Sequence, residues 1–386
     1  MPTDAASETL NPHQEAAVPI DRRTFLLTPA AALAAQESRQ IRTAAIGIGN
    51  RGTALLRQVL SNANARVTAV CDIDPQARDR AASAAARDNP RVFDDYRRVL
   101  DLADVDAVTI ASPCDLHAPM AADALRAGKY VYCEKPVGIT PEQVQSVLTA
   151  SRGAKGFLQI GQQLRYFPDL REVIRQIHGG VHGATLVVKA QRHSSAPEAG
   201  KERPRAAWYD DVKRSGDLIV ENAVHNIDVC NWIVNSRPVS AYGHGKKYFP
   251  KPIPAGTLMM DGFSVEYIYE NDVHLDYSQL YMHPRGLKEL SNGQWYIAFG
   301  DQGAVHVSKG LYYPMHAAAE PRDLLTAELR SSKEKAMEDF FACILEKRTP
   351  FADIKVAATA ALTAILGREA IYRRRSVEWK DLGVTI

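Results

Sequence analysis

RTAAIGIGNRGTALLRQVL, residues 42–60, begins with a strand-like run of apolar residues and ends with apolar residues at helical spacing. Three glycines stand between the two patterns. The apolar run at 43–48 predicts a short β-strand, and helical periodicity begins at about Arg51. Between them stands Gly47-Ile-Gly49-Asn50-Arg51-Gly52. Glycines in this pattern permit a tight turn and a close approach of the backbone to a pyrophosphate group. The following helix N-terminus offers free N–H groups and a positive dipole end to the phosphates.

The glycine pattern alone is a weak signal, but the next predicted strand strengthens it. That strand, ARVTAVCD (residues 65–72), ends at Asp72, twenty residues after Gly52. An acid at this place accepts hydrogen bonds from a ribose 2′-hydroxyl and repels a 2′-phosphate. The sequence therefore predicts a dinucleotide site that prefers NAD to NADP.

Strands and helices continue to alternate up to about residue 160. The segments VDAVTIASP (105–113), KYVYCEKP (129–136) and GFLQIGQQLR (156–165) predict further buried strands, separated by helical segments and short turns. This order predicts a Rossmann fold, a doubly wound parallel sheet with helices on both faces, whose ligands bind at the carboxyl ends of the strands. Polar and turn residues at or after these ends are expected to contact the cofactor together with the glycine loop, Asn50, Arg51 and Asp72: Ser112, Pro113, His117, Glu134, Lys135 and Arg165.

Composition bounds the remaining possibilities. With 386 residues, 46% hydrophobic and 24% charged, the chain is long enough for two domains with their own cores. A net charge of +2, with scattered basic residues, argues against nucleic-acid binding. No apolar run reaches the length of a membrane-spanning helix. The five cysteines form no CxxC pair, so neither a zinc site nor a disulfide framework is predicted.

The segment DRRTFLLTPAAALAA (21–35) raises the question of compartment. Arg22 and Arg23 precede a weakly apolar, alanine-rich stretch, as in a twin-arginine export signal. That route carries folded proteins, so it predicts a periplasmic protein that acquires its cofactor first and holds it tightly. Pro29 interrupts the apolar part, and the alternative is a loose leader or arm, residues 1–40, on a cytoplasmic protein.

The chain resembles the Gfo/Idh/MocA family, which contains glucose–fructose oxidoreductase and inositol dehydrogenases. The resemblance rests on six segments that together span most of the chain after residue 40: GIGNRG (47–52), Asp72, SPCDLH (112–117), AGKYVYCEKP (127–136), QLRYFP (163–168) and SGDLIVENAVHNID (215–228).

The resemblance implies a nucleotide domain, here residues 41–160, followed by an α+β domain, 161–386, with a large open, mostly antiparallel sheet. Alternating segments at 184–192, 239–247, 262–270, 272–281 and 295–307 agree with this. Two amphipathic helices are predicted within 331–350 and 353–375. In this family another subunit often covers the open face, so a homodimer or homotetramer is expected.

The resemblance also implies a catalytic group consisting of Lys135, Glu221 and His225. Glu221 stands where the family commonly has aspartate, and residues four apart share one face of a helix. Oxidation of a secondary alcohol needs a base for the hydroxyl proton, and histidine has a suitable pKa. We expect His225 to be this base and Glu221 to orient it or touch substrate. Lys135 would stabilise the alkoxide and relay the proton if burial lowers its pKa, and the roles of His225 and Lys135 are exchangeable.

A sugar-facing wall is expected from Arg165, His193, Trp208 and Tyr209 beside His225. The predicted function is an NAD-dependent oxidoreductase acting on a secondary hydroxyl of a sugar or cyclitol. The alternative is a glycosidase or lyase that oxidises its sugar transiently with a tightly bound, recycled NAD. A non-catalytic NAD-binding protein is a third possibility, against which Lys135 and His225 argue.

Overall fold

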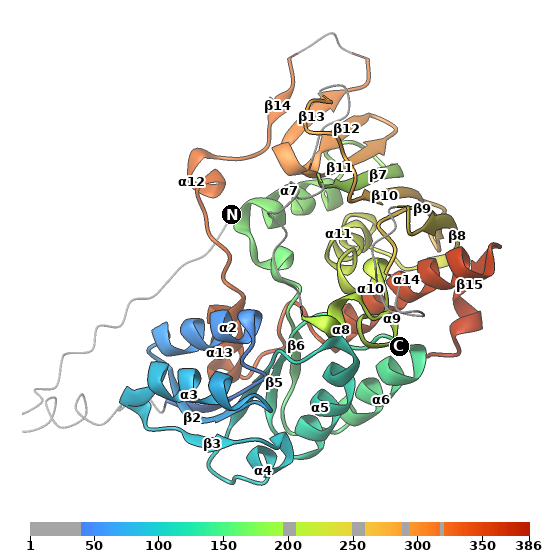
Figure 1. Cartoon of the computed structure of the whole chain (residues 1–386). Coiled ribbons are helices and arrows are strands. Elements are labelled where there is room, and N and C mark those ends of the chain that lie inside the picture. The colour runs from blue at the N-terminus through green and yellow to red at the C-terminus, as the bar shows by residue number, and fades with distance from the viewer. Residues whose placement is uncertain (1–39, 196–205, 249–258, 288–292, 317–319) are drawn as a thin grey trace, which may run out of the picture. The chain divides into compact units, whose positions relative to one another are not determined.

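The computed structural model describes residues 40–195, 206–248, 259–287, 293–316 and 320–386, which Figure 1 shows in colour. The predictions about the leader at 1–39 and its export signal lie outside these residues. Residues 40–386 form one compact unit.

The first sheet is parallel and has six strands in the order β3-β2-β1-β4-β5-β6. Its strands are almost continuously apolar, as expected for a sheet covered on both faces, and Val108, Ile110 and Val131 are fully buried. The predicted Rossmann sheet is confirmed. The strands are β1 (Ile41–Ile46), β2 (Ala65–Cys71), β3 (Arg91–Phe93), β4 (Ala107–Ile110), β5 (Tyr130–Cys133) and β6 (Leu158–Ile160).

Side-chain caps start several of the helices that cover this sheet. Asp74, Asp95 and Thr140 each accept a hydrogen bond from a backbone N–H in the first turn of the helix that begins after them. The helix after β4 begins at Cys114, directly after Pro113. The helices are α2 (Asn50–Ser61), α3 (Pro75–Ala84), α4 (Tyr96–Leu100), α5 (Cys114–Arg126) and α6 (Pro141–Ser151).

The second sheet has nine strands in the order β14-β13-β12-β11-β7-β10-β9-β8-β15. Its pairs are antiparallel except for β7 and β10, which run parallel, so the prediction of a mostly antiparallel sheet is confirmed. The strands are β7 (Thr185–His193), β8 (Pro238–Lys246), β9 (Gly262–Tyr269), β10 (His274–Leu280), β11 (Gly293–Gly300), β12 (Gly303–His306), β13 (Leu311–Pro314), β14 (Arg322–Asp323) and β15 (Val377–Glu378).

One predicted strand was wrong. Residues 295–307 form β11 and β12, two antiparallel strands that pair with each other through Gly300 and Gly303. Asp301 and Gln302 make the turn between these glycines, so Gly-Asp-Gln-Gly carries a hairpin signal that alternation alone does not reveal.

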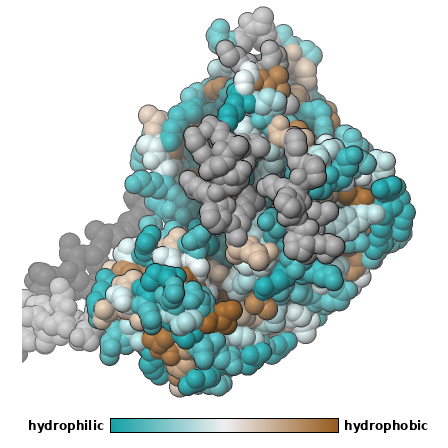
Figure 2. All heavy atoms as spheres, viewed as in Figure 1, coloured by the Kyte–Doolittle hydropathy of each residue, from teal (hydrophilic) through white to brown (hydrophobic). Residues whose placement is uncertain are grey.

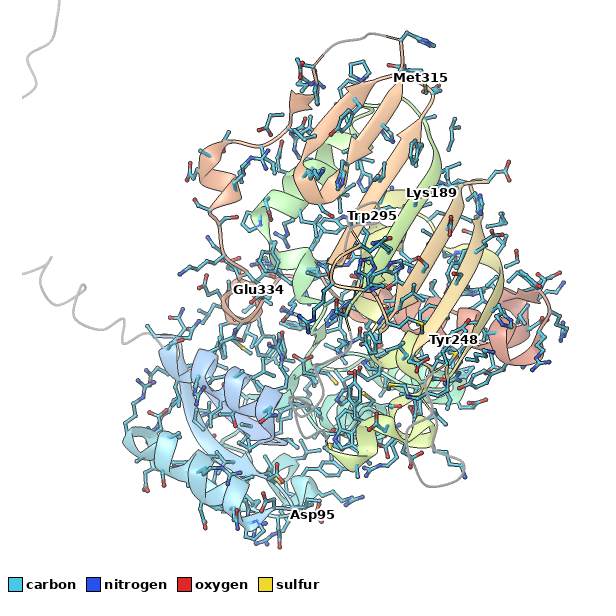
Figure 3. All side chains as sticks on the ribbon, turned by 45° about the horizontal axis from the view of Figure 1, so that its top comes forward. Asp95, Lys189, Tyr248, Trp295, Met315 and Glu334 are labelled. Carbon is cyan, nitrogen blue, oxygen red and sulfur yellow. The ribbon has the colours of Figure 1, made fainter. Side chains whose placement is uncertain are left out.

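Helices α11 (Val224–Val234) and α14 (Ile354–Arg373) pack on one face of this sheet (Figure 1). Buried tyrosines join the layers: the Tyr267 hydroxyl donates to the carbonyl of Thr363, and the Tyr269 hydroxyl donates to Asn231. On the other face lie Lys189 and Trp295, on neighbouring strands (Figure 3).

The C-terminal part of the chain returns to the first sheet. The N–H of Ile160 in β6 donates to the carbonyl of Ala352, and Phe340 of α13 (Ala336–Glu346) packs against Tyr132 and Phe157. The predicted boundary at residue 160 therefore separates two sheets, while the packing continues across it. The other helices are α7 (Pro168–His178), α8 (Ala207–Asp210), α9 (Val212–Ser215), α10 (Leu218–Glu221) and α12 (Ala327–Arg330).

No helix in the described part of the chain is long and apolar enough to cross a bilayer. On the face that Figure 2 shows, most residues are hydrophilic and the hydrophobic ones form small, separate groups.

Candidate active site

A cavity of about 1410 Å³ lies at the carboxyl ends of the parallel strands. One side is formed by the nucleotide half and the other by α8, α9 and Glu221 of α10. Many of the predicted cofactor residues line it, together with both predicted aromatic residues: Gly47, Gly49, Asn50, Arg51, Asp72, Ser112, Pro113, His117, Glu134, Lys135, Trp208 and Tyr209.

The glycine loop fits a dinucleotide. Gly47 has a φ of +80°, and a Cβ there would lie 2.8 Å from the backbone of Ala111 and Ser112. A Cβ on Gly52 would lie 1.8 Å from the carbonyl oxygen of Gly47, so the turn requires both glycines. A Cβ on Gly49 would meet no atom within 4 Å, so the space beside it is open. Gly49 is the N-cap residue of α2, and no side chain caps that helix. Gly49 and the first N–H groups of α2 would hold the pyrophosphate of NAD.

Asp72 is fixed at the carboxyl end of β2. One carboxylate oxygen accepts from the backbone N–H of Ile48 at 2.5 Å, and the other accepts from Asp74 at 2.9 Å. Both donors are backbone groups, and they hold the acid in place beside the glycine loop. The guanidinium of Arg78, which also lines the cavity, donates to the backbone carbonyl of Asp72 at 2.8 Å.

Asp72→Ala is expected to narrow the preference for NAD over NADP by at least tenfold. The carboxylate repels a 2′-phosphate and accepts from a 2′-hydroxyl, and alanine does neither. Titrating each dinucleotide against the wild type and the variant, with protein fluorescence as the signal, measures the change. Equal wild-type affinities for NAD and NADP would contradict the prediction.

Lys135 lies at the inner part of this cavity, after β5, and its peptide bond with Pro136 is cis. Its Nζ donates to the backbone carbonyl of Glu221 at 2.7 Å and to the carboxylate Oε1 of Glu221 at 2.9 Å. Burial is the largest single effect and lowers the pKa of this amine, but the charge and hydrogen bond of Glu221, with contributions from Cys114 and Glu134, together outweigh it and the pKa is raised. The condition under which Lys135 would relay the proton, a pKa lowered by burial, is not met, because Glu221 is its ion-pair partner.

His225 has the opposite electrostatics. Removal of the ring from water lowers its pKa well below the usual value, and the positive charges of Lys135, Arg192 and Arg51 lower it further. Nδ1 lies 2.9 Å from Oε1 of Gln162, whose amide nitrogen donates to the carbonyl of Val224 at 3.4 Å. This orientation of the amide assigns the proton to Nδ1. At neutral pH the ring is uncharged, and Nε2 is able to accept a proton.

Glu221 and His225 do not share one regular helix, contrary to the prediction from their spacing. The N–H of Ala223 bonds to the carbonyl of Leu218, five residues back, so the chain widens after Glu221. Glu221 ends α10, and His225 lies in α11. This break turns the Glu221 carboxylate to Lys135 and leaves Gln162 as the partner of Nδ1. The orienting role assigned to Glu221 therefore falls to Gln162.

Arg165 is not among the residues that line the cavity. Its guanidinium makes two hydrogen bonds to Asp228, at 2.8 and 2.9 Å, and lies over the rings of Trp232 and Phe351. Arg165 is 7% exposed and Asp228 is 1% exposed. The pair is a buried link between the segment after β6 and α11, and the prediction of a cofactor or substrate contact does not match this position.

His193 also lies away from the predicted place. Side chains alternate along β7, and His193 shares a face with Lys189, whereas Arg192 faces the helices. The Nε2 of His193 lies 3.1 Å from the hydroxyl of Ser278, on the same outer face. Because side chains alternate along a strand, the helix-facing residue is Arg192 and not its neighbour His193. The alternation of β7 in the sequence could have identified Arg192.

The ring of His117 connects two strand ends. Its Nδ1 lies 2.7 Å from the carbonyl oxygen of Pro136, and its Nε2 lies 2.8 Å from that of Ser112. Arg51 spans the cavity's inner side in a comparable way, with one nitrogen 2.6 Å from Glu134 and another 2.9 Å from Gln163. These contacts hold the walls of the cavity in position.

A Rossmann sheet with this glycine loop, joined to a second, mostly antiparallel sheet, defines a dinucleotide-binding protein of two-sheet architecture. The chain belongs to the Gfo/Idh/MocA family. The family model for the oxidoreductase family with an NAD-binding Rossmann fold matches residues 41–162, and that for the GFO/IDH/MocA C-terminal domain matches residues 170–306.

Relatives of known name agree with this assignment. The chain is 31% identical over 201 residues to an inositol 2-dehydrogenase of Rhizobium meliloti, covering 52% of this chain and 57% of that protein. It is 33% identical over 153 residues to a glycosyl hydrolase family 109 protein of Saccharopolyspora erythraea, covering 38% of this chain and 33% of that protein. The matched region thus spans less than two thirds of these curated relatives.

Solved structures share the fold over a longer range. The crystal structure of a putative myo-inositol dehydrogenase from Sinorhizobium meliloti superposes with a TM-score of 0.69 at 24% identity, covering 88% of this chain and 99% of that chain.

Proposed function

We propose that this protein is an NAD-dependent dehydrogenase that moves a hydride between a secondary hydroxyl of a sugar or cyclitol and nicotinamide. The observation that carries the proposal is the Lys135–Glu221 ion pair on the cavity wall, together with the imidazole of His225, which lies behind the residues that line the cavity and whose pKa the charge of Lys135 lowers. Lys135 is held protonated by Glu221, and its charge helps to keep His225 neutral. One group can stabilise a negative oxygen while the other takes up a proton.

Bound NAD would supply the hydride acceptor. Nε2 of His225 accepts the hydroxyl proton, while Nδ1 remains bonded to Gln162. Nζ of Lys135 donates to the substrate oxygen as its charge develops, and the carboxylate of Glu221 keeps the ammonium in place. Trp208 and Tyr209, whose rings lie 5.7 Å apart on the cavity wall, suit the apolar face of a sugar ring.

The direct test is to incubate the purified protein and NAD with a panel of sugars and cyclitols. Reduced nicotinamide is followed by its absorbance, with His225→Asn as the inactive control. Reduction of NAD by one class of polyol supports the proposal. A panel that gives no reduction, with NAD binding shown separately, contradicts it.

The alternative is a glycosidase or lyase that oxidises its sugar transiently, and the relative named for glycosyl hydrolase family 109 favours considering it. Such an enzyme releases cleaved product without adding NAD and without accumulating NADH. Measuring both products on the same glycoside panel distinguishes the two reactions.

We also propose that the protein is exported through its twin-arginine segment with NAD already bound and slowly released. Arg214 lies 3.2 Å from Asp115 of α5, so α9 is joined to the nucleotide half beside the cavity. Protein isolated from its native periplasm is expected to begin shortly after Ala35 and to retain NAD through gel filtration. An intact N-terminus, or complete loss of the dinucleotide, would contradict export or tight binding respectively.

The outer face of the second sheet suits a homo-oligomer, as a dimer or tetramer. Tyr242, Ile268, Phe299 and Tyr313 are 56%, 39%, 38% and 39% exposed on it. Exposed apolar side chains on a flat sheet favour association. A single-chain mass by light scattering at micromolar concentration would refute this proposal.

A further inference from the structure

Three polar side chains stand in one row across the second sheet. Arg192 of β7 pairs in register with Gln294 of β11 on one side and with Gln279 of β10 on the other. Residues paired across neighbouring strands point to the same face. The row lies at the carboxyl end of β7, on the face that packs against α11, because Tyr277 and Tyr296 of these strands point the same way and are buried there.

Arg192 differs from two other cations near the site, Lys135 and Arg51. Lys135 is paired with Glu221, and Arg51 is paired with Glu134. Arg192 has neither a hydrogen bond nor an ion pair with its side chain among the described residues, although it is only partly exposed. A charge that is partly removed from water without a partner costs free energy, which an anion bound there would offset.

The row contacts the segment that carries the assigned base. Gln279 donates to Asn222 at 2.9 Å, and Gln294 accepts from Asn226 at 3.4 Å. His225 lies between Asn222 and Asn226 in the chain. The charge of Arg192 lowers the pKa of the His225 imidazole, in agreement with this placement. Asn226 is fully buried between α11 and the sheet. Asn226 donates to the Tyr296 hydroxyl at 2.6 Å, while its buried Oδ1 has no hydrogen-bond partner in the described part of the chain.

We propose that Arg192 binds a carboxylate of the substrate, so that the sugar oxidised by this protein is a sugar acid, such as a uronate or aldonate. This inference rests on the proposed dehydrogenase function and specifies its substrate class. A planar guanidinium binds a carboxylate through two parallel hydrogen bonds. Gln279 is fully buried and bonds to Tyr277 and Asn222, so it fixes one side of the row. The exposed Gln294 flanks Arg192 on the other side. A single guanidinium without a partner among the described residues matches the single charge of a carboxylate better than the near-double charge of a phosphate.

A carboxylate at Arg192 would also act on the base. The positive charge of Arg192 lowers the pKa of His225, so neutralising that charge raises the pKa toward its usual value. The imidazole accepts a proton more readily when an acidic sugar is bound than when a neutral sugar is bound. Acidic sugars would therefore gain in the chemical step as well as in binding.

The test compares each sugar acid with its neutral counterpart on the NADH-loaded protein by calorimetry: D-glucuronate with D-glucose, D-galacturonate with D-galactose, and D-gluconate with D-glucitol. In the wild type, at least one acid is expected to bind 10-fold to 100-fold more tightly than its partner, the usual scale for a charge-assisted pair. D-glucose 6-phosphate is measured alongside.

Arg192→Met should reduce this preference to within about threefold, and Arg192→Lys should retain part of it. Lys189→Met is the matched control, since Lys189 lies on the same strand but on the outer face, paired with Asp276. It should keep the full wild-type preference. Thermal unfolding of each variant checks that the fold is intact.

The inference is overturned if no acid binds more tightly than its neutral partner in the wild type, if the phosphate binds better than every acid, or if Arg192→Met keeps the preference. Parallel assays of NAD reduction separate the two hypotheses. Oxidation of neutral sugars in preference to acids contradicts the carboxylate site at Arg192 and supports the dehydrogenase function. Binding of acids through Arg192 without any NAD reduction supports the carboxylate site and contradicts the dehydrogenase function.

Discussion

Lys135→Met is expected to reduce turnover by about two orders of magnitude or more, the usual scale for losing one acid–base or oxyanion partner. Methionine keeps the length and apolar character of the stem but cannot donate to an oxygen. The ammonium donates to the Glu221 carboxylate and both residues line the cavity, so its loss removes a donor from the cavity wall. Folding and NAD binding should largely survive. Single-turnover kinetics with the best substrate, beside a dinucleotide titration, measures both effects.

A second readout separates a catalytic lysine from a structural one. The charge of Lys135 lowers the pKa of His225, so removing that charge should raise this pKa. A neutral imidazole is the active form of the base, and the acidic limb of the rate–pH profile should therefore move to higher pH in Lys135→Met. Near-normal turnover with an unmoved limb would show that Lys135 is structural.

The sequence predicted the first sheet well because its signals are local. The glycine loop, the strand ending at Asp72 and the lysine after β5 each lie within a few residues of the element that positions them. In a parallel sheet the carboxyl ends of the strands meet at one edge. Residues at these ends can therefore be predicted to lie near a common ligand site from the strand positions alone.

Arg165 shows where that reasoning stops. It comes after a strand end, as a cofactor residue should, but Asp228, sixty-three positions later, captures its guanidinium inside the core. Whether Arg165 binds a ligand or forms an ion pair depends on a contact with a residue far away in the sequence. The spacing of neighbouring residues does not predict that contact. The same applies to Glu221, whose partner Lys135 lies eighty-six positions earlier.

The remaining differences come from small shifts of the backbone. A one-residue difference in strand phase exchanges His193 for Arg192 on the helix-facing side of β7. One widened turn after Leu218 separates Glu221 from His225 although they are four apart in sequence. Periodicity predicts the element in both cases, but the face presented by each side chain depends on how the strand and helix pack.

His225→Asn is expected to reduce turnover by about two orders of magnitude or more, with loss of the acidic limb of the pH profile. Asparagine retains a side-chain donor that can reach Oε1 of Gln162, so the loop around it should hold, but it has no group that accepts a proton near neutral pH. Lys135→Met with His225→Asn should lose much less than the product of the two single effects, because both residues serve the same proton and oxygen. The double-mutant cycle is completed by measuring the rates of the wild type, the two single variants and the double variant under single-turnover conditions at several pH values.

If His225→Asn keeps most of its turnover while Lys135→Met does not, the lysine is the proton acceptor. The ion pair that raises its pKa must then break when substrate binds, because a protonated amine cannot accept the proton.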